Sequence, residues 1–411
     1  MNLNSATGLV EIFVTLVAVA TAAALVFRRI RVPYTVLLLI VGLGAVLVAP
    51  GLHAAVPSEV ILTVFLPGLV FESAYRLDIY ELRRSSGAIA FLAVPGVLIS
   101  AAAVAGLLSL AVGLPPELGF LVGAMLAATD PAAVIATIKR LRAPERLTTL
   151  IEAESLFNDG TAIVVFAVAV AALNGQQTLT GAAVSLIVTV VASAAIGLAA
   201  GIFAGRVVAL TDDHLVELSI TLVLAYGTYL LADAWHLSGI IATVVAAIAF
   251  GVLARSGAMS DRAQEDVDTV WEFAAYLLTA VLFVLIGLTI DVGALNAALL
   301  PIAWGLVAVI GSRAVIFYGM VGPADRLLRK GRDHIPTGWL HVMIAAGMRG
   351  AVSVALALSL PADVPQRALL VEVTFGITLA TLIFQGLALN PIVHRVLPSG
   401  PSRGRPGSLP A

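Results

Sequence analysis

Residues 117–138, ELGFLVGAMLAATDPAAVIATI, form an apolar run that is interrupted by Thr129-Asp130-Pro131. A transmembrane helix needs about 20 apolar residues, and this run is long enough. Pro131 removes one backbone donor and disfavours helical geometry at Asp130, so backbone groups near Thr129 should be freed. Ionisable groups inside a span are costly and usually mark an ion or proton pathway. The run therefore predicts a broken membrane helix with a functional carboxylate at the break.

The composition of the whole chain excludes an ordinary soluble domain. Hydrophobic residues make up 60%, charged residues only 12%, and the mean hydropathy is +1.05. Soluble proteins carry about 25% charged residues. The net charge of -2 and the lack of a basic block give no sign of nucleic acid as a partner. The chain has no cysteine and no phosphate-binding loop, so we expect neither thiol chemistry nor a nucleotide, and no cofactor.

Apolar runs long enough to cross about 30 Å of hydrocarbon occur thirteen times along the chain. We therefore expect an all-α polytopic membrane protein with about 13 transmembrane helices, and a disordered tail over 398–411. The thirteen runs are approximately 8–27, 34–50, 59–75, 87–112, 117–138, 148–173, 181–210, 215–233, 238–254, 268–290, 297–321, 338–360 and 367–396.

Basic residues predict the orientation of these spans. Threading thirteen spans places twenty of the 23 Lys and Arg residues on one side, Arg367 on the other, and Arg313 and Arg349 within spans. By the positive-inside rule the basic side is cytoplasmic. We therefore expect the N-terminus outside, the C-terminus in the cytoplasm, and a location in the plasma (inner) membrane.

A second break is predicted in the twelfth span, where Gly347-Met348-Arg349-Gly350 places two glycines and a cation near the midplane. Spans one to six and eight to thirteen then form two halves of opposite orientation, each with its fifth helix broken. Broken helices at matching positions of inverted repeats indicate the binding site of a secondary transporter.

Further carboxylates lie in or near the spans, in Glu154-Ser155-Leu156-Phe157-Asn158-Asp159-Gly160 and at Glu72. Glu154 and Asp159 are separated by about 140° on a helix, whereas Ser155 and Asp159 share a face. We expect Asp159 and Ser155 to line an ion site and Glu154 to pair with Arg313, the alternative being Glu154 as a direct ligand. Glu72 is either a ligand or a residue that extends to the membrane surface.

Arg349 also has two interpretations: a counter-charge that holds the unwound helices together, or a proton-coupled gate. We favour the first, because arginine stays protonated.

In their order and spacing these motifs resemble the NhaP-type sodium/proton antiporters of the cation/proton antiporter-1 family, relatives of the animal sodium/hydrogen exchangers. The resemblance covers nearly the whole chain. The motifs are Ala128-Thr129-Asp130-Pro131, the stretch Glu154 to Gly160, Ser312-Arg313-Ala314, Gly347-Met348-Arg349-Gly350-Ala351, Phe384-Gln385-Gly386 and Asn390-Pro391.

The resemblance implies a homodimer in which a core domain moves against a dimerisation domain. It assigns 1–85 and 177–294 to the dimerisation domain, and 86–176 and 295–397 to the core, with the fifth and twelfth helices unwound and crossing. It also implies that the transported cation, Na+ or Li+, is surrounded by Asp159, Asp130, the Ser155 hydroxyl, the Thr129 carbonyl and Glu72. Asn158 takes the place of a second aspartate of electrogenic relatives, which implies electroneutral one-for-one exchange.

Elementary chemistry makes such an exchange intelligible. A hard cation prefers several oxygen ligands, and the Asp159 carboxylate can instead take a proton, so cation and proton compete for one site. If the core reorients only when the site is neutralised, exchange is obligatory. A K+/H+ antiporter of the same fold is the main alternative. A cation channel or an intramembrane aspartyl protease that uses Asp130 and Asp159 fits the sequence less well, because inverted halves favour a carrier and Asn158-Asp159-Gly160 lacks the Gly-x-Gly-Asp signature.

Overall fold

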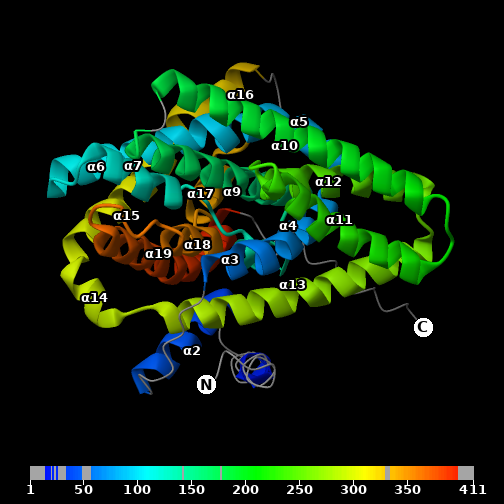
Figure 1. Cartoon of the computed structure of the whole chain (residues 1–411), viewed down its shortest axis with the longest axis horizontal. Coiled ribbons are helices and arrows are strands. Elements are labelled where there is room, and N and C mark those ends of the chain that lie inside the picture. Colours follow the sequence, from blue (N-terminus) through cyan, green and yellow to red (C-terminus); the bar gives the residue numbers. More distant parts are fainter. Residues whose placement is uncertain are drawn as a thin grey trace, which may run out of the picture.

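The computed structural model of the 411-residue chain describes residues 14–19, 21–22, 25, 34–48, 57–140, 143–175, 178–328 and 334–396. Every regular element in these segments is a helix, and the long helices α10 (Leu179–Val208) and α13 (Asp261–Thr289) run along the long axis of the molecule (Figure 1). The predicted all-α fold is confirmed. The tail 398–411 and most of the first expected span, 8–27, lie outside the described residues.

Nine helical stretches within the described segments are long and apolar enough to cross a membrane. The second to the thirteenth expected spans each coincide with a helix or a broken helix, whereas the count of thirteen stays a prediction. Apart from α10, α13 and the two broken helices, they correspond to α2 (Tyr34–Val48), α3 to α4 (Ser58–Tyr75), α5 to α6 (Ile79–Val112), α9 (Glu145–Leu173), α11 (His214–Ala234), α12 to η4 (Gly239–Ala258), α15 to α16 (Leu299–Leu328) and α19 (Arg367–Val396).

Both predicted interruptions are present. The fifth span consists of α7 (Pro116–Met125) and α8 (Ala132–Arg140), and the twelfth consists of α17 (Thr337–Ala345) and α18 (Ala351–Leu358). The non-helical residues between them contain Thr129-Asp130-Pro131 in one case and Gly347 to Gly350 in the other. Proline chemistry accounts for the first break and the paired glycines for the second.

Proline also explains two π-helical turns inside other spans. Pro95 lies within η3 (Leu92–Gly96), and Pro67 follows η2 (Ile61–Phe65) at the start of α4 (Leu66–Tyr75). A proline removes one i to i−4 hydrogen bond and its ring collides with the carbonyl one turn earlier. One added residue in the turn relieves that collision, so these spans continue without a full break.

The helices pack in two groups. In the first, α2 packs on α13, while α12 (Gly239–Leu253) packs on α4, α10 and α11. In the second, α6 (Val97–Val112) packs on α7 and on α15 (Leu299–Ala314), and α19 packs on α15, α17 and α18. The long helix α9 contacts members of both groups. The two broken helices therefore belong to the second group, and α8 and α18 contact α2 and α13 of the first.

Small residues explain the closest packing in the first group. Gly197, Gly201 and Gly205 recur every fourth residue on α10, and a Cβ on any of them would collide with α12. Helices inside a membrane approach each other closely at such small residues.

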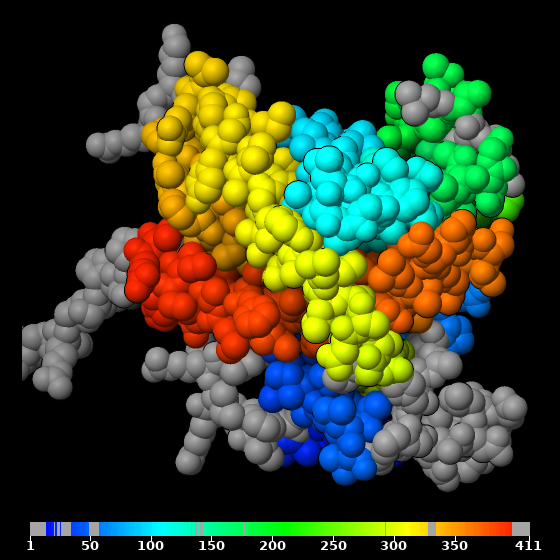
Figure 2. All heavy atoms as spheres, turned by 90° about the vertical axis from the view of Figure 1, so that its left-hand side faces the viewer, coloured from blue at the N-terminus to red at the C-terminus, as the bar shows by residue number. Residues whose placement is uncertain are grey.

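Figure 2 looks onto one end of the bundle, where the turn between α6 and α7 (cyan) is exposed and α14 (Val292–Ala297, yellow) lies against α19 (red).

Candidate functional site

The two unwound segments are bonded directly to each other. The backbone amide of Asp130 donates to the carbonyl oxygen of Met348 at 2.8 Å. A Cβ added to Gly350 would collide with the Cβ and Oδ2 atoms of Asp130, so the chains meet too closely for any side chain at that position. The unwound segment of each broken helix therefore packs directly on the unwound segment of the other.

Arg349 completes this crossing. Its Nη1 atom donates to the carbonyl oxygens of Ala127 and Ala128, at 3.0 and 3.2 Å, just beyond the end of α7. The last carbonyls of a helix lack intrahelical partners and form the negative end of its dipole. Arg349, only 1% exposed, therefore supplies both a hydrogen-bond donor for these carbonyls and a positive charge at the negative end of the dipole.

Arg313 places a second buried cation at the carboxyl end of the other broken helix. Its guanidinium contacts both Glu154 oxygens, at 2.8 and 3.2 Å, and also donates to the carbonyl oxygen of Met343 at 2.8 Å, in the last turn of α17. Both charged side chains are buried. A planar guanidinium matches a carboxylate in this two-point geometry. The Glu154 carboxylate is thus paired with Arg313 and does not point at the crossing of the broken helices.

Hydroxyl and amide groups from α9 fix the first break. The Asn158 Nδ2 atom donates to Thr129 Oγ1 at 2.8 Å, and Thr129 Oγ1 is also hydrogen-bonded to Ser155 Oγ at 2.8 Å. Asp130 caps its own side of the break, because its Oδ1 atom accepts from the Ala132 amide at 2.9 Å. The helix α9 therefore holds Thr129 in place while the Asp130 side chain closes the start of α8.

Asp159 differs from these groups. It is 8% exposed, and its Oδ1 atom is buried without a hydrogen-bond donor among the described residues. A buried carboxylate oxygen without a partner is costly, so it is either protonated or available to a cation.

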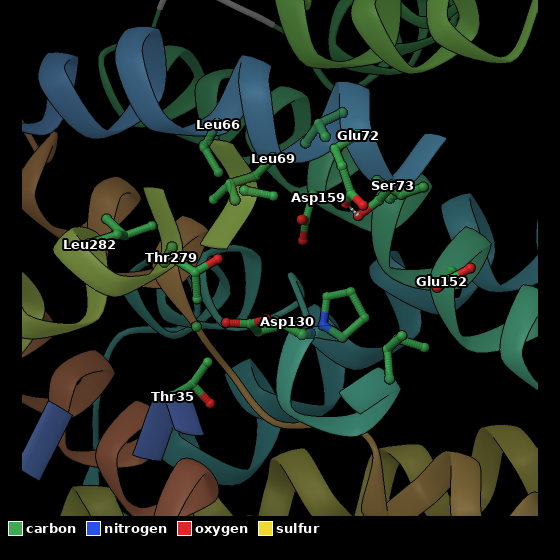
Figure 3. A pocket seen from close by; sticks show the side chains of 18 of the residues that line it. Thr35, Leu66, Leu69, Glu72, Ser73, Asp130, Glu152, Asp159, Thr279 and Leu282 are labelled. Atoms are coloured by element: carbon green, nitrogen blue, oxygen red, sulfur yellow. Dashed lines mark hydrogen bonds between the residues drawn. The ribbon is translucent and has the colours of Figure 1, made fainter. Parts of the chain in front are cut away.

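Asp159 lines a cavity of about 360 Å³ between the two groups of helices. Figure 3 shows Asp159, Asp130 and Glu72 around it, with Thr35 and Thr279 on the side of Asp130. The wall comes from both breaks, from α2, α4 and α13, and from α8 and α9. Its polar members are Tyr34, Thr35, Glu72, Ser73, Arg76, Thr129, Asp130, Lys139, Glu152, Asp159, Glu272, Tyr276 and Thr279.

The sequence-predicted residues occupy three positions relative to this cavity. Glu72, Thr129, Asp130 and Asp159 line it. Ser155 and Asn158 reach it through their hydrogen bonds to Thr129. The charged residues Glu154, Arg313 and Arg349 are not part of its wall and hold the broken helices instead.

Sequence reasoning missed part of the wall. Tyr34 stacks on Tyr276 with ring centroids 5.5 Å apart, and Lys139 pairs with Glu152 at 3.2 Å. Glu72 pairs with Arg76, which follows it by four residues, at 3.2 Å. This spacing on one helix face was a usable signal for the last pair. The first two pairs join distant segments and left no local pattern in the sequence.

Carboxylates, hydroxyls and backbone carbonyls at a cavity that is large enough for water molecules suit a hard cation that sheds part of its hydration shell. The same carboxylates can bind protons. Because the cavity lies between two helix groups and beside two broken helices, the arrangement is that of a carrier site.

Comparison with known proteins identifies the family. The family model "Sodium/hydrogen exchanger, transmembrane" matches residues 14–395. The Na+/H+ antiporter ApNhaP of Aphanothece halophytica is 38% identical over 376 residues, which cover 90% of this chain and 70% of that protein. The Na+/H+ antiporter NhaP of Pseudomonas aeruginosa is 37% identical over 361 residues, which cover 84% of this chain and 82% of that protein.

A solved structure has the same fold. The sodium proton antiporter MjNhaP1 from Methanocaldococcus jannaschii superimposes with a TM-score of 0.76 over 95% of this chain and 98% of that one, at 21% sequence identity. Both the membrane-spanning architecture and the sequence over nearly its full length lead to one conclusion. The chain belongs to the transmembrane sodium/hydrogen exchanger family of transporters.

Proposed function

We propose that this protein exchanges Na+ or Li+ for H+ across the membrane, one for one, with Asp159 as the carboxylate that cation and proton share. The names of its relatives, Na+/H+ antiporters at 38% and 37% identity, support the substrates. The observation that carries the proposal is the buried Asp159 oxygen, which has no hydrogen-bond donor among the described residues and belongs to a residue in the cavity wall.

The cation site combines Asp159 with Asp130, the Ser155 hydroxyl, the Thr129 carbonyl and Glu72. Three of these residues line the cavity beside Asp159, and Ser155 is bonded to one of them. A hard cation needs several oxygens, and no single element of this chain presents them all. Their joint presence at the crossing of two broken helices supports this ligand set.

Neutrality of the site explains why exchange is coupled. A charged, empty carboxylate is costly to carry past an apolar gate, whereas a carboxylate that holds Na+ or H+ is not. The loaded site can therefore face either side of the membrane, and the empty one cannot. The gradient of one ion then drives the other, without a cofactor.

The ion pair Glu154–Arg313 and the cation Arg349 act as structural parts of the crossing. Each arginine neutralises the carbonyl end of a half-helix inside the membrane, where water is not present to do so. Asn158 is an uncharged neighbour of Asp159 and donates to Thr129. One ionisable group fewer at this position is consistent with electroneutral exchange.

Movement requires two bodies, and we assign 86–176 and 295–397 to a core that moves against 1–85 and 177–294. The grouping of α6, α7, α15 and α17 to α19 apart from α10 to α13 supports the division. We further propose a homodimer in the plasma membrane, joined through the second body. The distribution of basic residues supports an outside N-terminus and a cytoplasmic C-terminus.

A proteoliposome assay tests the function. Purified protein is reconstituted with an internal pH dye, and Na+, Li+ or K+ is added in turn, with the voltage clamped by valinomycin. We expect Na+ and Li+ to drive proton efflux, and Asp159→Asn to abolish it while the helical content and the melting temperature are retained. Undiminished exchange by Asp159→Asn refutes the assignment of the shared carboxylate.

A further inference from the structure

Glu72 is already paired with a cation from its own helix. The Arg76 Nη1 atom lies 3.2 Å from Glu72 Oε1, and both residues line the cavity that contains Asp159. Only Ser73 Oγ, at 3.3 Å, provides a further contact to this carboxylate among the described residues. A carboxylate held by a guanidinium in this way has less negative charge to offer to a transported ion.

Arg76 also has a second set of partners, on α13. Its Nη2 atom donates to the carbonyl oxygen of Asp268 at 2.6 Å and contacts Glu272 Oε2 at 3.3 Å, and its Nε atom lies 3.8 Å from Asp268 Oδ1. Arg76 directly follows the last residue of α4, where the backbone leaves the helix. The guanidinium can therefore release Glu72 and remain neutralised by α13, without a charge being left alone.

We propose that Arg76 is a tethered competitor of the transported cation for Glu72, so that it sets the apparent affinity of the site for Na+. The inference rests on the proposed function and adds a residue to it. When Na+ enters, Glu72 turns from Arg76 to the ion, and Arg76 stays with Asp268 and Glu272. Part of the binding free energy of Na+ is used to break the Glu72–Arg76 pair, which keeps the affinity low.

The competition predicts that removing Arg76 and removing its partner on α13 shift the KM for Na+ in opposite directions. Removal of its charge frees Glu72 and lowers the KM for Na+. Removal of its alternative partner by Glu272→Gln leaves Arg76 more firmly on Glu72 and raises the KM. Both changes act on binding, so the maximal rate should change less than the KM.

A general field effect is the competing explanation, because any cation at the cavity repels Na+. Lys139 provides the matched control. It lines the same cavity, and its ion-pair partner is Glu152, at 3.2 Å, and not Glu72. Its side chain is more exposed than that of Arg76, 55% against 26%. If Arg76 competes directly with Na+, its removal changes the KM only when Glu72 is present. If Arg76 acts through its field alone, its removal changes the KM with or without Glu72.

The experiment measures Na+-driven proton flux against Na+ concentration for wild type and the single variants Arg76→Gln, Lys139→Gln, Glu72→Gln and Glu272→Gln. Three double variants, Arg76→Gln/Glu72→Gln, Lys139→Gln/Glu72→Gln and Arg76→Gln/Glu272→Gln, are measured in the same way. We expect Arg76→Gln to lower the KM by about two- to fivefold, the range for a partly exposed ion pair. Lys139→Gln should lower the KM by much less than Arg76→Gln does, and equally with and without Glu72. In the Glu72→Gln background, Arg76→Gln should have no further effect, and Glu272→Gln should raise the KM only when Arg76 is present.

Two results overturn the inference: an unchanged KM in Arg76→Gln, or an equal fall of the KM with and without Glu72. Melting temperatures and the variant Arg76→Lys, which keeps the charge and should keep most of the high KM, separate competition from damage to the fold. Failure of the function itself looks different. Wild-type protein without Na+-driven proton flux refutes both proposals, whereas an active wild type with an unresponsive Arg76→Gln refutes only this one.

Discussion

Asp130 and Met348, 218 residues apart in the chain, share a backbone hydrogen bond of 2.8 Å between the two interrupted helices. Neither residue could make this bond within its own helix, because each lies where the helical ladder has stopped. The bond fixes the Asp130 carboxylate beside the cavity that contains Asp159. The geometry of the site therefore depends on how closely the two breaks approach each other.

The close approach at Gly350 leads to the first prediction. A methyl group in Gly350→Ala would collide with the Cβ and Oδ2 atoms of Asp130. We expect the crossing to separate, with a loss of proton flux of at least tenfold and a lower melting temperature. Gly311→Ala is the matched control, since a Cβ at Gly311 meets nothing within 4 Å. Normal flux in Gly350→Ala would show that the crossing tolerates displacement.

The buried pair Glu154–Arg313 leads to the second prediction. Glu154→Gln removes one charge and leaves Arg313 buried beside the end of α17. Loss of one partner of a buried pair costs about 3–5 kcal/mol in the free energy of unfolding. We expect a clear drop in the melting temperature in detergent, with little change in the KM for Na+ of the protein that remains folded. A raised KM at unchanged stability would instead identify Glu154 as a ligand.

The third prediction concerns charge stoichiometry. Asn158 lies next to Asp159 and donates to Thr129 Oγ1 at 2.8 Å. In Asn158→Asp a further carboxylate joins the site, directly beside Asp159, and the Thr129 hydroxyl can donate to it in turn. We expect transport to become sensitive to membrane voltage, measured as flux with valinomycin clamps of opposite sign. The wild type should respond equally to both clamps, and an equally insensitive variant would contradict our interpretation of Asn158.

The sequence predicted the parts of this site that depend on local chemistry. Pro131 after Asp130, and the glycines on either side of Met348-Arg349, indicate where helices must stop, and the structure has both breaks there. Buried charges inside apolar spans must find partners, which favoured the pairing of Glu154 with Arg313 over a role of Glu154 as a ligand, and the structure has this pair. Helical spacing placed Ser155 and Asp159 on one face of α9.

The remainder depends on packing between distant segments. Nothing near Arg349 in the chain indicates that it reaches the carbonyl oxygens of Ala127 and Ala128. The same holds for Tyr34 on Tyr276, and for Arg76 between Glu72 and α13. Such contacts depend on how helices cross, and an apolar helix surface specifies its crossing partner only weakly.

The competition between Na+ and H+ for Asp159 is the central claim, and equilibrium binding tests it most directly. Isothermal titration calorimetry of Na+ binding to the purified protein, repeated across a range of pH in buffers of different ionisation enthalpy, reports both the affinity and the protons released. Our account predicts that the Kd for Na+ rises as the pH falls, by about tenfold per unit once the site is mostly protonated, with about one proton released per ion bound. Asp159→Asn should bind no Na+. A Kd that stays constant across the titration range, with no proton released, would contradict the account.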